Sequence, residues 1–321
     1  MSILKDLNIN YTKGDANNFS GRKTALKNQY WHQDIKVSHI DDIQFNNETN
    51  IGIIGYVCDE GVRRNKGRIG AKNGPKSVRN KLGKLPIHFK NKNITDFGDI
   101  ICVDENLEDC QKGLSAIVQK LISNNSFPIA IGGGHDIAYA NFNGIKKALK
   151  GKQKNKIGII NFDAHFDLRP VENQPNSGTP FNQILSENEN VEYLVLGIQQ
   201  QSNTKELFQI AHDKNVNIIN SFECDSFNSD IEDKLNSFIN KVDHLYITID
   251  LDGFSSAYAT GVSAPSPLGF SPNFVFKTLS HIFKSKKVIS CDIAELNPTF
   301  DVDTNTASLA ARIIDFIVVN L

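Results

Sequence analysis

Short apolar runs alternate with amphipathic stretches along most of this chain, and the alternation limits the folds that it can adopt. Eight runs have the length and β-branched character of strands, and several are apolar at consecutive positions. Strands buried on both faces are typical of a parallel sheet covered by helices. The expected strands span residues 51–57, 94–97, 128–132, 156–162, 193–198, 216–219, 244–249 and 287–293.

The segments between these runs show helical periodicity. Leu107, Leu114, Ile117 and Leu121 form one apolar stripe within residues 107–122, as expected for a helix that packs on a sheet. Similar stripes occur at residues 77–85, 136–149, 204–212, 231–239, 273–283 and 307–319. Alternating strands and helices imply right-handed crossovers, and they predict an open, doubly wound α/β sheet.

The first 50 residues differ from the rest, because they are polar and show neither period. We expect residues 1–50 to be an irregular N-terminal extension packed on the body, with Trp31 and Phe45 as anchors. No linker or change of composition follows residue 50. Residues 51–321 are therefore expected to form a single catalytic domain.

Composition excludes several classes of function. A net charge of −1 provides no electrostatic attraction to nucleic acid or to an anionic membrane surface. Residues 1–20 lack the apolar core of a signal peptide, and no run approaches the roughly 20 apolar residues that span a bilayer. The five cysteines are scattered, which argues against a disulfide framework or a zinc knuckle. We expect a cytoplasmic protein.

Six metal-ligating side chains follow three of the expected strands. Ligands of open α/β sheets bind beyond the carboxyl ends of the strands, and residues at i, i+2 and i+4 of an extended segment share one side. Each acid taken alone is also compatible with a turn or a helix cap. Together, four carboxylates and two imidazoles exceed the needs of one tetrahedral site and suit a two-metal centre, with manganese as a natural candidate. The six are His135, Asp163, His165, Asp167, Asp250 and Asp252.

Other polar residues near these strand ends are candidates for binding substrate. Glu295 follows the last expected strand and could hold an amidine or guanidine by charge-assisted hydrogen bonds. Arg169 could hold a carboxylate, and Arg64 and Arg68 lie in a glycine-rich basic loop. Alternatively, Glu295 could cap a helix, Arg169 could be a surface arginine, and the basic loop could simply be solvated. Without further context, the segment from Ser177 to residue 181 indicates a turn.

These motifs together resemble the ureohydrolase superfamily, which contains arginases, agmatinases and formimidoylglutamases. The resemblance covers about residues 50–315 and implies a three-layer α/β/α fold around an eight-stranded, mainly parallel sheet. It also implies two Mn²⁺ ions per chain and a homo-oligomer, either a trimer or a hexamer. The motifs that carry it are Gly-Gly-Gly-His135-Asp136, Asp163-Ala-His165-Phe-Asp167, Asp250-Leu-Asp252 and Asp292-Ile-Ala-Glu295-Leu-Asn-Pro298.

The resemblance also implies a role for each ligand. One ion would be held by His135, Asp163, Asp167 and Asp250, and the other by Asp163, His165, Asp250 and Asp252. Asp163 and Asp250 would then bridge the ions. A metal-bridging hydroxide would attack the amidine carbon of the substrate while Glu295 orients the cationic nitrogens.

Within the superfamily the chain is most like formimidoylglutamase. Ser177-Gly178 stands where arginases and many agmatinases have His-Gly, and Arg169 with Arg64 and Arg68 would suit a substrate with two carboxylates. Formimidoylglutamases cleave N-formimidoyl-L-glutamate to L-glutamate and formamide in histidine degradation. The alternatives are an agmatinase or other guanidino-compound ureohydrolase, and a non-catalytic metal-binding protein of the same fold.

Overall fold

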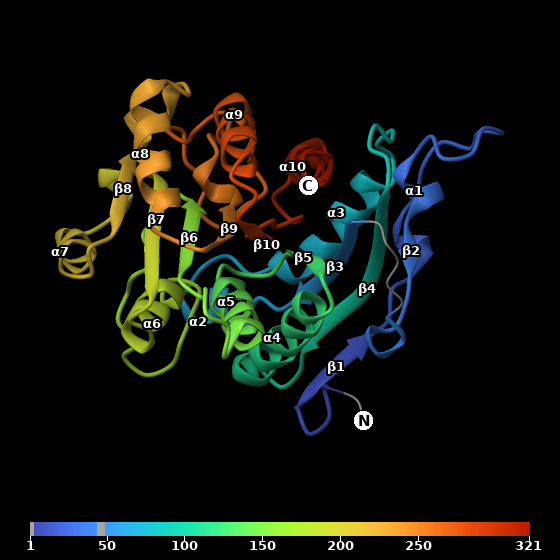
Figure 1. The fold of residues 1–321 in the computed structure, drawn as a ribbon, viewed down its shortest axis with the longest axis horizontal. Helices are drawn as coiled ribbons and strands as arrows, with labels where there is room; N and C mark the ends of the chain where they lie inside the picture. Colours follow the sequence, from blue (N-terminus) through green and yellow to red (C-terminus); the bar gives the residue numbers. More distant parts are fainter. Residues whose placement is uncertain (1–2, 44–48) are drawn as a thin grey trace.

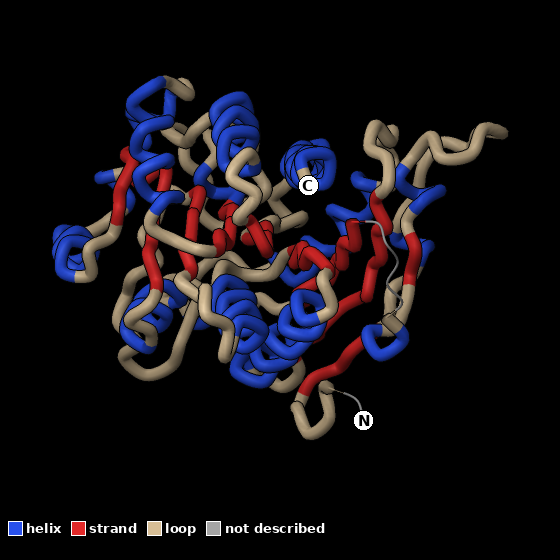
Figure 2. Tube along the Cα trace, in the orientation of Figure 1, coloured by secondary structure: helices blue, strands red, loops and turns tan. Residues whose placement is uncertain are grey.

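The apolar runs of the sequence form neighbouring strands of one sheet. The computed structural model describes residues 3–43 and 49–321, and these residues contain ten strands (Figures 1 and 2). Their order is β1-β4-β3-β5-β10-β9-β6-β7-β8, and β2 pairs with β4 outside this path. The eight expected strands are β3 (Thr49–Val57), β4 (Lys92–Cys102), β5 (Ser126–Ile131), β6 (Ile157–Phe162), β7 (Val191–Ile198), β8 (Asn217–Asn220), β9 (His244–Asp250) and β10 (Val288–Ala294).

Two further strands come from the segment that was expected to be irregular. β1 (Ile9–Thr12) pairs antiparallel with β4, and β2 (Lys36–Val37) pairs with β4 in parallel. The sheet of the described residues therefore has ten strands, not eight. The apolar pattern did not reveal β1 and β2, because pairing at the edge of a sheet requires backbone hydrogen bonds and no buried side chain on either face.

Helices cover both faces of the sheet, and the three-layer α/β/α prediction is confirmed (Figure 2). Ile53 packs with one layer and its neighbour Ile54 with the other, since successive side chains of a strand point to opposite faces. One layer contains α3 (Gly74–Leu82), α8 (Ser229–Asn240), α9 (Pro272–Phe283) and α10 (Asn305–Asn320). The other contains α4 (Leu107–Ser123), α5 (Ile137–Leu149), α6 (Pro180–Glu187) and α7 (Lys205–Asp213).

Short helices occur where the sequence indicated loops. α1 (Trp31–Asp34) and α2 (Glu60–Arg64) have four and five residues. Helix α6 begins at Pro180, within the segment of residues 177–181 that was expected to be a turn. Proline is well suited to the first position of a helix, where its missing N–H would be unpaired in any case.

The N-terminal segment contacts the body through Trp31. This side chain is 1% exposed, its ring packs edge-on against Phe89, and its Nε1 donates to Asp315 Oδ1 on α10 at 2.7 Å. The anchoring expected of Trp31 is thus confirmed, whereas Phe45 lies outside the described residues. None of the helices in the described part of the chain combines the length and the apolar character needed to cross a membrane.

Candidate active site

Four neighbouring strands in the middle of the sheet end at the same level. They lie in the order β5, β10, β9 and β6, and all three pairings are parallel. The residues paired at their carboxyl ends are Ile131 with Ile293, Ala294 with Asp250, and Ile249 with Phe162. All six expected metal ligands and Glu295 lie at these ends or in the segments that follow them, so the sheet itself brings them to one place.

Unusual backbone conformations direct several of these side chains. Gly133 has a φ of +73°, and a Cβ there would lie 2.5 Å from the carbonyl oxygen of Cys58. Asp167 and Glu295 adopt φ values of +48° and +67° although neither is glycine. Left-handed backbone at residues with a Cβ costs free energy, and such residues concentrate at functional sites.

The first group of ligand-type atoms surrounds one nitrogen of His135. Its Nδ1 lies 3.1 Å from Asp163 Oδ2, 2.9 Å from Asp167 Oδ2 and 3.2 Å from Asp250 Oδ2. The four atoms are all within 4.8 Å of one another. One ring nitrogen has at most one proton to donate, so hydrogen bonding alone cannot satisfy three carboxylates here.

The second group shares Asp163 with the first. His165 Nδ1 lies 3.5 Å from Asp163 Oδ1 and 3.3 Å from Asp252 Oδ2. Asp163 thus presents one oxygen to each group, as the expected bridging role requires. Asp250 does not belong to this second group, because its Oδ1 accepts the backbone N–H of Asp252 at 2.8 Å.

A buried hydrogen-bond chain determines the tautomer of His135. Thr248 Oγ1 donates its only proton to Asp292 Oδ1 at 2.6 Å, and it lies 2.9 Å from His135 Nε2. The Thr248 oxygen can therefore only accept from His135, which places the imidazole proton on Nε2. In neutral His135 the lone pair of Nδ1 then points at three carboxylate oxygens. That arrangement is repulsive without a cation and favourable with one.

The raised pKa values of several acids in the site indicate that the site is built to hold positive charge. Burial and Asp250 raise the pKa of Asp252 well above its usual range, and burial with Asp250 and Asp252 does the same for Glu295. Burial and Asp163 raise the pKa of Asp167 to about 6. Among the described residues, Asp252 Oδ1 and Glu295 Oε2 are buried atoms without a hydrogen-bond partner. Cations in both groups would reverse these shifts, so the donor set fits divalent ions.

A cavity of about 290 Å³ opens over both groups. Glu295 lines it and is 4% exposed; its Oε1 accepts the backbone N–H of His135 at 3.0 Å, which leaves Oε2 for another partner. The lining also includes Lys66, Arg68, Arg169 and Ser177. The cavity thus combines acids at the strand ends with cations from the surrounding loops.

Two of the three expected arginines reach this cavity. Arg169 Nη1 donates to Asn65 Oδ1 at 2.6 Å, and Asn65 Nδ2 donates to Ser177 Oγ at 3.1 Å. Arg68 Nε donates to the Ser263 carbonyl at 2.9 Å. Gly178 lies behind the lining, and its carbonyl accepts the backbone N–H of Arg169.

Arg64 was expected in the substrate site and is not there. Its side chain is 8% exposed, and its guanidinium pairs with Glu60 at 2.8 Å and with Glu108 at 2.7 Å. Glu60, one helical turn earlier in α2, and Glu108 on α4 hold the Arg64 guanidinium away from the cavity. The expectation failed because a basic loop does not reveal which of its arginines have acidic partners elsewhere in the fold.

Sequence reasoning missed four residues of this site. Thr248 and Asp292 orient His135, while Asn65 and Lys66 line the cavity or its rim. A carboxylate inside an otherwise apolar strand was the available signal for Asp292, since a buried acid needs partners. Asn65 and Lys66 lie in the basic loop whose cations were expected to attract an acidic substrate, and Thr248 had no signal of its own.

Comparisons with known proteins agree with this geometry. A sequence model described as the arginase family matches residues 49–319. The formimidoylglutamase of Clostridium tetani is 41% identical over 322 aligned residues, which cover 96% of this chain and 95% of that protein. The formimidoylglutamase of Staphylococcus haemolyticus is 38% identical over 309 residues, with 95% and 98% covered.

A solved structure shows the same fold. It is the Trypanosoma cruzi formiminoglutamase with Mn²⁺, which is 27% identical, has a TM-score of 0.77, and covers 87% of this chain and 95% of its own. The family model spans residues 49–319, which include the strands β3 to β10. This chain belongs to the arginase family.

Proposed function

We propose that this protein hydrolyses N-formimidoyl-L-glutamate to L-glutamate and formamide with two Mn²⁺ ions. The observation that carries the metal centre is that His135 Nδ1 lies 2.9–3.2 Å from carboxylate oxygens of Asp163, Asp167 and Asp250. Relatives about 40% identical over nearly all of the chain are formimidoylglutamases, which supports the choice of substrate.

The two groups of ligands would hold the ions. His135, Asp163, Asp167 and Asp250 would hold one ion, and Asp163, His165 and Asp252 would hold the other. When bound, two divalent ions lower the pKa of water so that it ionises near neutral pH, and they thereby supply the nucleophile. Hydrolysis adds water across the C–N bond: the formimidoyl carbon leaves as formamide, and the glutamate nitrogen leaves as an amine.

Glu295 would bind the cationic end of the substrate. Its Oε1 is held by the His135 N–H, so Oε2 is the oxygen that can accept from an amidinium N–H. A charge-assisted hydrogen bond of this kind is strong and directional. Glu295 would thus place the amidine carbon over the two metal groups.

The cations at the rim would bind the two carboxylates of the substrate. Arg169 is positioned by Asn65, and Ser177 is joined to the same amide, so the three form one polar chain beside the cavity. Arg68 and Lys66 line the cavity from the loop that follows α2. A dianion suits this rim, whereas agmatine would bring a free ammonium into a cationic environment.

A substrate panel with product identification tests this assignment. Manganese-loaded protein is expected to release formamide and glutamate from N-formimidoyl-L-glutamate, and to act far more slowly on N-formimidoylglycine, which lacks one carboxylate. Urea from agmatine or another guanidino compound, with no formamide from the first substrate, would refute the choice of substrate while leaving the metal centre intact. No turnover of any substrate, with less than one metal ion per chain, would indicate a non-catalytic protein.

We further propose a homo-oligomer, a trimer or a hexamer, as the arginase-family resemblance implies. Light scattering coupled to size-exclusion chromatography measures the number of chains, and a monomeric mass would contradict it.

A further inference from the structure

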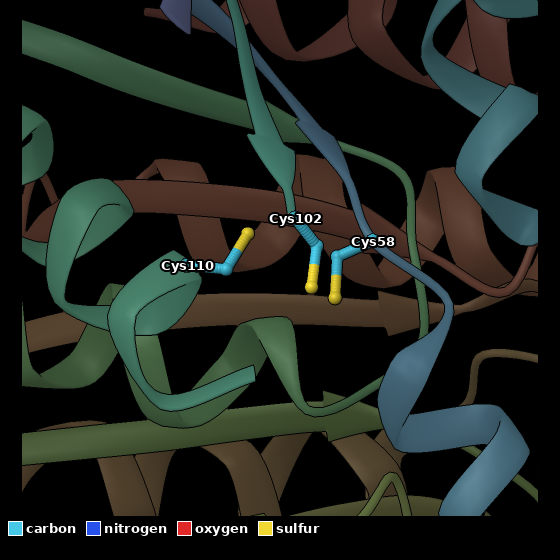
Figure 3. Close-up of side chains that lie close together, drawn as sticks. All are labelled: Cys58, Cys102 and Cys110. Atoms are coloured by element: carbon cyan, nitrogen blue, oxygen red, sulfur yellow. The ribbon is translucent and has the colours of Figure 1, made fainter. Parts of the chain in front are cut away.

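Three of the five cysteines lie close together where the strands β3 and β4 end. Cys58, Cys102 and Cys110 are far apart in sequence, yet their sulfur atoms all lie within 4.8 Å of one another (Figure 3). All three are free thiols. The scattered cysteines of the sequence had argued against a disulfide framework or a zinc knuckle. The fold brings the three together.

The parallel sheet places the first two side by side. Val57 pairs with Ile101 at the ends of β3 and β4, and Cys58 directly follows β3 while Cys102 is the last residue of β4. Figure 3 shows these two sulfur atoms next to each other, with Cys110 opposite them on α4. The three thiols thus come from the end of β3, the end of β4 and helix α4.

The cluster is shielded from water except near Cys102. Cys58 and Cys110 are 1% and 0% exposed, whereas Cys102 is partly exposed. Hydrogen bonds from the Cys110 and Cys58 thiols lower the pKa of Cys102 to about 4, and the positive charge of Arg64 acts in the same direction. Cys102 is therefore the thiol of the cluster that loses its proton most readily.

We propose that Cys58, Cys102 and Cys110 bind a soft metal ion, Zn²⁺ or Cu⁺, at a site separate from the carboxylate–imidazole centre. Sulfur ligands select these ions over manganese. A tetrahedral Zn²⁺ with Zn–S bonds of about 2.3 Å needs sulfur atoms about 3.8 Å apart, so the thiols must approach by about 1 Å at most. Binding of the metal ion displaces the thiol protons, which pass to the solvent. The partly exposed side at Cys102 leaves a position for water on Zn²⁺, while Cu⁺ needs only the three sulfurs.

A titration of the reduced, manganese-loaded full chain tests the site. Cd²⁺ serves as the spectroscopic substitute for Zn²⁺, and Cu⁺ is titrated separately. A thiolate-to-metal charge-transfer band reports sulfur ligation only, so exchange at the carboxylate–imidazole centre does not contribute. We expect one Cd²⁺ or one Cu⁺ per chain, and a loss of affinity of at least about tenfold in Cys110→Ser, since such sites depend on each ligand. Cys224→Ser, which removes a buried cysteine outside the cluster, should leave the band unchanged.

Alkylation of the unaltered protein gives a second readout that does not require a variant to fold. Bound metal should protect Cys58, Cys102 and Cys110 from iodoacetamide, as located by mass spectrometry. The proposal is overturned if neither ion produces the charge-transfer band or if the band persists in Cys110→Ser. If the reduced chain binds neither ion but Cys58 and Cys102 form a disulfide when peroxide is added, the cluster is a redox pair and not a metal site.

Discussion

Replacing Glu295 with glutamine tests how the cavity recognises its substrate. Glu295→Gln preserves the shape of the side chain, and its amide oxygen can still accept the His135 N–H. The amide nitrogen then takes the place of Oε2, the carboxylate oxygen of Glu295 that has no hydrogen-bond partner. An amidinium would meet a donor where it needs an acceptor.

The structure sets the size of the effect. Because Oε1 is already occupied, the substitution removes one charge-assisted hydrogen bond rather than two. One such bond is worth about 1.5–3 kcal/mol, which corresponds to a loss of about 10- to 150-fold in kcat/KM. A loss of several thousandfold would require that both carboxylate oxygens bind substrate.

Steady-state release of glutamate from N-formimidoyl-L-glutamate measures this change, together with the manganese content of each protein. Glu232→Gln, on the exposed side of α8, is the matched control and should retain full activity. The reasoning fails if Glu295→Gln keeps its metal and also keeps its kcat/KM. It also fails if the loss merely follows loss of manganese, because Glu295 would then be a ligand.

Three further perturbations address the metal centre and the fold. Asp163→Asn should abolish detectable turnover and lower manganese content, measured by elemental analysis, because Asp163 faces both ligand groups; retained metal with full activity would contradict this. Arg79→Ala should lower the free energy of unfolding by about 3–5 kcal/mol, since it leaves the buried Asp96 unpaired, whereas Arg312→Ala at the surface should have little effect in the same urea titration. Burial raises the pKa of Asp136 to about 7, so the folded metal-free chain holds a proton that the unfolded chain loses near pH 4. This contribution to stability is present at low pH and disappears as pH rises from 4 to 7. Asp136→Asn should remove this part of the pH dependence, and an unchanged slope would refute it.

Much of the fold could be predicted because its determinants are local. Consecutive apolar residues indicated strands buried on both faces, and the eight strands predicted in this way are all present. The short β1 and β2 escaped prediction, since the long edge strand β4 pairs with them through the backbone. Helix α6 escaped for a related reason: its eight residues are too few for a clear helical stripe.

The residues of the candidate site also fall into those that local spacing could predict and those that it could not. Residues two apart at a strand end share a side, so the Asp163-x-His165-x-Asp167 spacing already placed these side chains together. The partners of an arginine are set by residues distant in sequence, and Arg64 pairs with Glu108 on α4 instead of reaching the cavity. No local pattern contains that information.

The sequence by itself determined the doubly wound sheet, the strand ends that carry the ligands and the kind of metal centre that those ligands suit. Only the tertiary structure decided the proton position on His135, the freedom of Glu295 Oε2, and the meeting of Cys58, Cys102 and Cys110. The physical reason is the distance along the sequence over which each kind of interaction acts. Periodicity and spacing act over a few residues, whereas a tautomer, an unpaired oxygen or a cluster of thiols depends on which distant segments pack side by side.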